Sequence, residues 1–113
     1  MKFLISTFSM KFFNQLFEMK FLFKFYIKAI KIAARKNEIY IVYYLLSKRD
    51  HIPDSLFECC YALVGVIIPS TIKTIGKKAF FKCKSITNVL IPEECTLIDE
   101  YCFASCSELK EIN

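Results

Sequence analysis

The sequence predicts an α+β repeat protein, in which a helical N-terminal region precedes a short solenoid of stacked units. Three observations support this: a 23-residue period in the C-terminal half, a helically spaced row of cations in the N-terminal half, and a change of composition between them. Eight of the 12 Phe residues precede residue 26, and residues 1–50 carry a net charge of +7 against +5 for the whole chain. We therefore expect a basic, Phe/Lys-rich helical region over residues 1–50 and repeats over residues 51–113.

Cationic residues in the N-terminal region recur at spacings of three and four. At 100° per residue they fall within an arc of about 80°. All the remaining positions from 21 to 34 are apolar. The pattern predicts an amphipathic helix over residues 20–35. A strand also fits residues 20–28, but the spacing of the last two cations excludes it beyond that point. The five cations are Lys20, Lys24, Lys28, Lys31 and Arg35.

The segment that follows, IAARKNEIYIVYYLLSKRD over residues 32–50, is similar to the second half of one ankyrin repeat. The resemblance implies helices near residues 29–36 and 39–48. One such unit cannot bury its own apolar face, so we expect the helices to pack on the adjacent repeats and cover their open first coil.

The C-terminal half repeats with an offset of 23 residues. IPSTIKTIGKKAFFKCKSITNVL over residues 68–90 is followed by IPEECTLIDEYCFASCSELKEIN over residues 91–113. A degenerate partial unit over residues 51–67 keeps the apolar positions but lacks the Ile-Pro pair. Positions that hold the same residue in the two complete units are Ile68/Ile91, Pro69/Pro92, Ile75/Ile98, Phe80/Phe103 and Cys83/Cys106.

Each unit is predicted to hold a strand and a short helical turn. Residues 86–91 are β-branched and apolar, and the following Pro ends the strand because it has no N–H to donate. Gly76 and its equivalent Asp99 are residues that tolerate turn geometry. In the run KKAFFKC, a helical turn would place Phe80 and Cys83 on one face. A strand and a helical turn within 23 residues match the size of a leucine-rich repeat.

The running pattern of I-P, I-G, A-F, C and I-x-I-P over residues 51–113 resembles the BspA-like leucine-rich repeat. Residues 68–90 carry the pattern most completely, whereas the last unit has Asp99 in place of Gly and Cys102 in place of Ala. The resemblance implies a right-handed solenoid with strands along its concave side. It also implies adhesion and protein binding, often at the cell surface, and it brings no catalytic residues.

Five of the six cysteines occupy core positions of the period. Cys60, Cys83 and Cys106 share one repeat position, so we expect them to stack in neighbouring coils as small apolar side chains. A Cys83–Cys106 disulfide is the alternative in an oxidising compartment. The spacing lacks the paired C-x2-C of a zinc site, and no His near the thiols would activate a nucleophile. We therefore expect neither a metal nor a cofactor.

The composition also argues against an enzyme, because one His and two Gly leave few residues for a catalytic triad or a phosphate-binding loop. We expect a non-enzymatic module that binds a protein ligand through polar positions flanking the strands. The second unit has a net charge of +5 and the third −5, a contrast that would guide partners or neighbouring chains. The predicted contact residues are Thr87, Asn88, Lys110 and Glu111.

A second function remains open, in which the basic helix over residues 20–35 binds an anionic membrane surface. The uncharged runs are too short to span a bilayer, and the N-terminus lacks a cleavage site typical of a signal peptide. No nucleic-acid-binding motif is present, so we expect no nucleic-acid partner. The sequence ends on a strand-like segment without a polar cap, which predicts a short or truncated family member and self-association through its last repeat.

Overall fold

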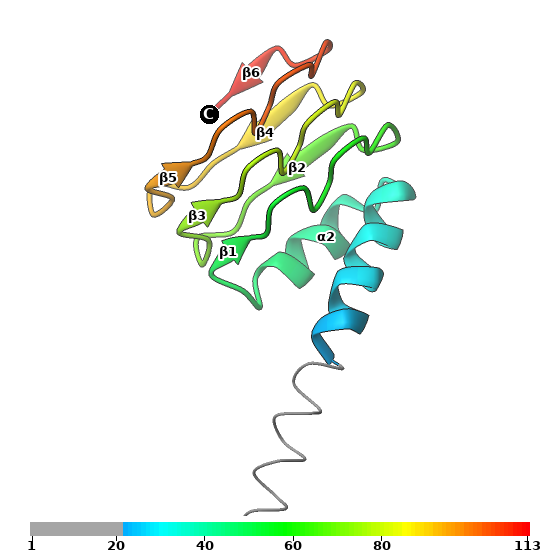
Figure 1. Ribbon diagram of the computed structural model, residues 1–113, viewed down its shortest axis with the longest axis vertical. Helices are drawn as coiled ribbons and strands as arrows, with labels where there is room; N and C mark the ends of the chain where they lie inside the picture. Colours follow the sequence, from blue (N-terminus) through cyan, green and yellow to red (C-terminus); the bar gives the residue numbers. More distant parts are fainter. Residues whose placement is uncertain (1–21) are drawn as a thin grey trace, which may run out of the picture.

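The computed structural model describes residues 22–113, which form two helices followed by six short strands (Figure 1). The first helix covers residues 22–35 within the described part, and Lys20 lies outside it. The later elements are α2 (Ile39–Leu46), β1 (His51–Ile52), β2 (Gly65–Ile67), β3 (Thr74–Ile75), β4 (Asn88–Leu90), β5 (Leu97–Ile98) and β6 (Glu111–Ile112). The predicted helix is thus confirmed from residue 22 onward, and the strand alternative is wrong there.

The strands form two parallel sheets of three strands each, in the orders β1-β3-β5 and β2-β4-β6. β1 and β2 each pair with the strand 23 residues further along, as in Ile52 with Ile75 and Val66 with Val89. The same offset relates β3 to β5 and β4 to β6. The strand predicted within residues 86–91 is confirmed as β4. Three repeat units therefore lie side by side, and we call residues 51–67, 68–90 and 91–113 the first, second and third unit.

Apolar side chains at equivalent positions stack between the two sheets. The rings of Phe57 and Phe80 are 5.0 Å apart between centroids, and those of Phe80 and Phe103 are 5.3 Å apart. Phe80 and Cys83 are both fully buried, which confirms the predicted shared face. One continuous core therefore runs through the units, and offset ring stacking adds to the area that each Phe buries.

The predicted helical turn in KKAFFKC is wrong. Alternate N–H groups instead bond within the unit and to the next unit: Ala79 N–H donates to Gly76 O at 3.2 Å, whereas Phe80 N–H donates to Cys102 O at 2.9 Å. This alternation requires two residues per unit in the left-handed region. They recur at the same positions in every unit, with φ between 57° and 61°: Ser55 and Cys59, Lys78 and Lys82, Tyr101 and Ser105. None is Gly or Asn, so residue type alone does not predict this conformation.

Gly76 is required for close approach between units rather than for its turn geometry, since its φ is not positive. A Cβ at this position would stand 2.6 Å from Asp54 N and 2.8 Å from Ile52 O. Gly76 N–H donates to that same Ile52 carbonyl at 2.8 Å, so a side chain would push the second unit away from the first.

The helices pack on the first unit, as expected of a helical flank. Ile30 of the first helix and Leu46 of α2 are fully buried in the same core as the repeats. Tyr26 O–H donates to Leu45 O at 2.8 Å, which joins the two helices. Asn37 Oδ1, in the turn between the helices, accepts a bond from Val64 N–H at 3.0 Å just before β2. The helical pair thus occupies the place that a preceding repeat would take.

Candidate protein-binding face

The outward face of the β2-β4-β6 sheet is exposed beside α2. Val66 and Val89 point into the core, so their neighbours Gly65, Asn88 and Leu90 point outward. This alternation follows from the two-residue period of a strand. The outward positions are partly buried on β2 and exposed on β4. Together they form a surface that mixes polar and apolar groups.

The structure brings the four predicted contact residues together at the starts of two strands in one sheet. Asn88 begins β4 and Glu111 begins β6, and Thr87 and Lys110 directly precede them. Asn88 lies directly beside Glu111 in the parallel register, and both are exposed. Thr87 O accepts a bond from Lys110 N–H at 2.9 Å, while the Thr87 hydroxyl donates to Val64 O at 3.3 Å. The four positions form a contiguous polar cluster whose backbone is held by bonds between units.

Helix α2 adds apolar groups to this face that sequence reasoning missed. Tyr40 is 79% exposed and, with Ile39, lines a shallow groove of about 190 Å³ against Asn88 and Leu90. A Cβ on Gly65 would lie 3.7 Å from Ile39 Cδ1, an ordinary contact distance, so the start of α2 lies directly against β2. Tyr side chains supply much contact area at protein interfaces. The signal in the sequence was the run of tyrosines at 40, 43 and 44, which a purely buried helix would not carry.

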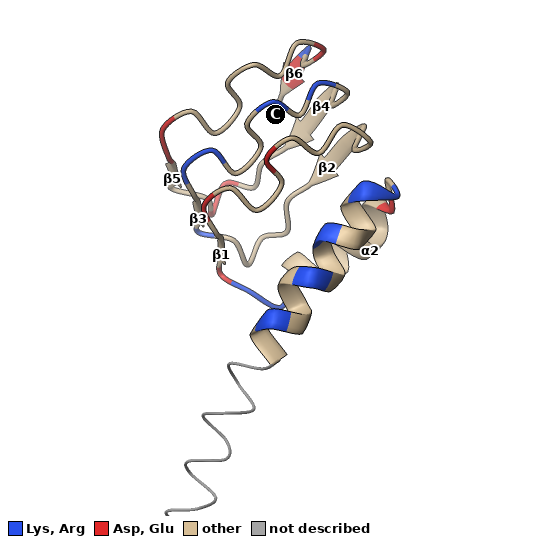
Figure 2. Cartoon of the chain, turned by 45° about the vertical axis from the view of Figure 1, so that its right-hand side comes forward, with Lys and Arg blue, Asp and Glu red and all other residues tan. Residues whose placement is uncertain are grey.

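The cations of the first helix form one row along it (Figure 2), but they differ in what lies around them. Lys24 and Lys28 are exposed and line no pocket with the repeats. Lys31 and Arg35 instead line a pocket of about 450 Å³ between the helix and the turn over residues 55–62. The described part of the chain contains no helix long and apolar enough to cross a membrane. Neither the fold nor the family supports lipid binding by this helix, which stays a prediction.

Cation–π contacts hold the two helices together. The Arg49 guanidinium lies 4.8 Å from the centre of the Phe23 ring and 4.6 Å from that of Tyr26. Burial raises the pKa of Tyr26, and the charge of Arg49 opposes that shift. Arg49 therefore contributes to helix packing through cation–π contact and is not available to a ligand.

All six cysteines are free thiols, and of the five expected at core positions three are buried and two partly buried. The buried ones are Cys60, Cys83 and Cys102. Cys83 Sγ donates to Phe57 O at 3.0 Å, and Cys106 Sγ donates to Phe80 O at 3.1 Å, so each thiol bonds to the preceding unit. Burial raises the pKa of Cys83 and of Cys102 to about 12. At neutral pH these two thiols stay protonated and make poor nucleophiles. Within residues 22–113, no three His, Cys, Asp or Glu side chains gather as metal ligands.

Short parallel strands repeated every 23 residues, with a continuous apolar core and polar outer positions, define a repeat protein of the leucine-rich class. The family model of the BspA type leucine-rich repeat region (6 copies) matches residues 43–113, and the chain belongs to this family. The match confirms the resemblance seen in the sequence, and proteins of this class are generally non-enzymatic interaction modules. Comparison with curated proteins and with solved structures finds no match.

Proposed function

We propose that this chain is a non-enzymatic, adhesion-type module that binds a protein ligand across the outward face of β2-β4-β6. The single observation that carries the proposal is the cluster at the starts of β4 and β6, where the exposed Tyr40 lines a groove with Asn88. The cluster consists of Thr87, Asn88, Lys110 and Glu111. A central aromatic and apolar patch with a polar rim is the usual composition of a protein-binding surface.

The wider architecture belongs to the same proposal. The three units form a short solenoid with a 23-residue period, which follows a basic N-terminal region that is helical over residues 22–35 and Ile39–Leu46. A rigid stack of strands suits binding, because little conformational entropy is lost when a partner covers a surface that is already ordered. An adhesion role places the ligand outside the cell that makes the protein, in keeping with the family.

Site-specific photo-cross-linking tests the proposal on the full chain. A photoreactive residue is placed at position 88, or at the exposed position 73 on the opposite sheet as a control. Surface proteins of the cells that produce the chain, and of cells that they contact, provide the candidate ligands. We expect a cross-linked product at position 88 only, which disappears when excess unlabelled chain competes.

Matched variants make the competition specific. The competitor N88R with E111R should fail to displace the product, whereas E94R with T96R, which changes the charge equally on the other side, should compete fully. All four positions are exposed, so both variants retain the core. Equal competition by the two variants, or equal cross-linking at position 73, would exclude this face as the binding site.

A further inference from the structure

Where the first unit meets the first helix, it has a row of backbone carbonyls to which no described residue donates. In the later units, every second carbonyl of the turn accepts an N–H from the unit before it. These bonds measure 2.8–2.9 Å between the first and second units and 2.9–3.1 Å between the second and third. The acceptors are Lys77, Ala79 and Phe81 in the second unit, and Glu100, Cys102 and Ala104 in the third.

The equivalent carbonyls of the first unit belong to Asp54, Leu56 and Glu58. No other residue in the described part of the chain donates to them. The left-handed residues Ser55 and Cys59 repeat the backbone geometry of the later units, so these carbonyls point back toward the first helix. A helix cannot supply donors at this spacing, because its own N–H groups are bonded within it. A backbone carbonyl is a strong acceptor, so a donor that reaches this row can form hydrogen bonds with it.

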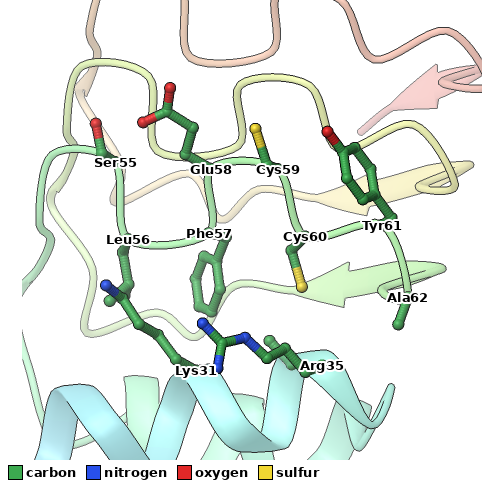
Figure 3. A pocket seen from close by; sticks show the side chains of 11 residues that line it. Lys31, Arg35, Ser55, Leu56, Phe57, Glu58, Cys59, Cys60, Tyr61 and Ala62 are labelled. Carbon is green, nitrogen blue, oxygen red and sulfur yellow. The ribbon is translucent and has the colours of Figure 1, made fainter.

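A pocket of about 450 Å³ is lined by Leu56 and Glu58 of this row, and Asp54 lies just outside it. Figure 3 shows Lys31 and Arg35 reaching from the helix toward the turn, where Leu56, Phe57 and Cys60 point toward them. Among the described residues, neither cation forms an ion pair. The side chain of Glu58, the only acid that lines the pocket, points away from the helix. The pocket therefore offers two unpaired positive charges, an apolar floor and a row of acceptors.

We propose that this pocket binds an extended, acidic peptide segment of a partner protein, which donates alternate backbone N–H groups to the carbonyl row. Between the first and second units, the donors to such a row are the N–H groups of Ser55, Phe57 and Cys59, which are every second residue. An extended peptide likewise presents its N–H groups on one edge at every second residue. Its carboxylates pair with Lys31 and Arg35, and Arg is suited to bidentate contact with a carboxylate. The peptide takes the backbone place of a missing preceding repeat, which is a form of strand addition. The volume falls within the range of pockets that bind small ligands.

Fluorescence anisotropy of the full chain with a labelled, acetylated peptide Glu-Val-Glu-Val-Glu tests the proposal. We expect saturable binding to the wild type and a loss of roughly tenfold or more with K31E and R35E, since charged hydrogen bonds are removed. The matched control K24E with K28E carries the same charge change on the same helix and should lose no more than about twofold. Circular dichroism checks that each variant is folded, and K31Q with R35Q replaces any that is not.

Altered peptides separate backbone recognition from charge. A version N-methylated at alternate residues keeps its carboxylates but cannot donate, so we expect it to bind roughly tenfold more weakly. The amide resonances of residues 54–62 should shift on binding, and those of the equivalent turn in the third unit should not. Absence of binding, equal losses in the two charge-reversal variants, or full binding of the N-methylated peptide would each overturn the proposal. These outcomes are independent of the face on β2-β4-β6, because the two sites share no residue.

Discussion

The second and third units hold the same residue types at their core positions but bury them to different extents. Ile75 is fully buried, whereas its equivalent Ile98 is 43% exposed; Val89 is fully buried, whereas Ile112 is 48% exposed. The second unit has a neighbour on both sides, and the third has one among the described residues. Burial in this protein therefore depends on position in the stack as much as on residue type. Equivalent substitutions in the two units should have unequal effects on stability.

The largest difference is expected at the stacked Phe rings. Phe80→Ala should lower the free energy of unfolding by about 3–5 kcal/mol, because it leaves a cavity between two rings. Phe103→Ala should cost about half as much, since that ring has one stacked neighbour and is only partly buried. Urea denaturation of the two variants measures both values. Equal losses would show that the third unit is as tightly packed as the second.

The next effect is expected at Gly76. Gly76→Ala should destabilise the protein by about 1–3 kcal/mol, because the new Cβ would meet backbone atoms of the first unit. The matched control is Asp99→Ala at the equivalent position of the third unit, where a Cβ is already accommodated. Asp99→Ala should cost less, although it removes a carboxylate that accepts a bond from Glu100 N–H at 2.7 Å. Thermal unfolding monitored by circular dichroism compares the two.

The free energy of unfolding should fall at alkaline pH because of the buried thiols, and the exposed thiols should contribute less to this fall. The pKa of Cys83 is raised to about 12 in the folded state, whereas an unfolded thiol titrates near pH ~8.5. Because the folded pKa is the higher one, the stabilisation is complete below pH ~8.5 and is lost as the pH rises toward 12. By pH ~10 the loss should reach roughly 1–2 kcal/mol for each such thiol.

The variant C83A should therefore show a shallower fall in unfolding free energy between pH ~8.5 and ~10 than the wild type does. C106A is the matched control, because the pKa of Cys106 is raised by burial but its side chain is only partly buried. Its pH dependence should stay closer to that of the wild type. If C83A and the wild type give the same slope, then the Cys83 thiol does not remain protonated in the folded protein.

The smallest effect is expected for the ion pair between the units. Lys77 Nζ lies 3.4 Å from Glu100 Oε2, and the two side chains are 50% and 58% exposed. A double-mutant cycle with K77A and E100A should give a coupling free energy of about 0.2–1 kcal/mol, which salt weakens. A larger coupling would mean that the charge contrast between the two units contributes to their association within the chain.

The repeat and its register could be predicted from the sequence, because identical apolar residues recur at a constant offset and must meet in a stack. The equivalent positions of Cys60, Cys83 and Cys106 could be predicted from the same offset. The backbone of the turn could not be predicted, because the left-handed positions hold Ser, Cys, Lys and Tyr rather than Gly. Tertiary hydrogen bonds to the next unit stabilise that conformation, and a local propensity argument does not include them.

The candidate sites were predictable to different degrees. Thr87 and Lys110 were found because their positions repeat beside a strand, so their proximity follows from the period. The contribution of Tyr40 depends on how α2 packs against Gly65, which no spacing in the sequence reports. The pocket at Lys31 and Arg35 arises where a helix takes the place of a repeat. The helical spacing placed both cations on one side, but only the packing turns them toward the carbonyl row.

The constant 23-residue offset between paired strands also has a kinetic consequence. Each new unit closes a loop of the same length, so the entropic cost of adding a unit does not grow along the chain. Folding can then begin at one adjacent pair of units and spread to its neighbours, as in a one-dimensional array. Insertion of a further 23-residue unit into the middle of the stack should therefore raise stability while leaving the refolding rate nearly unchanged.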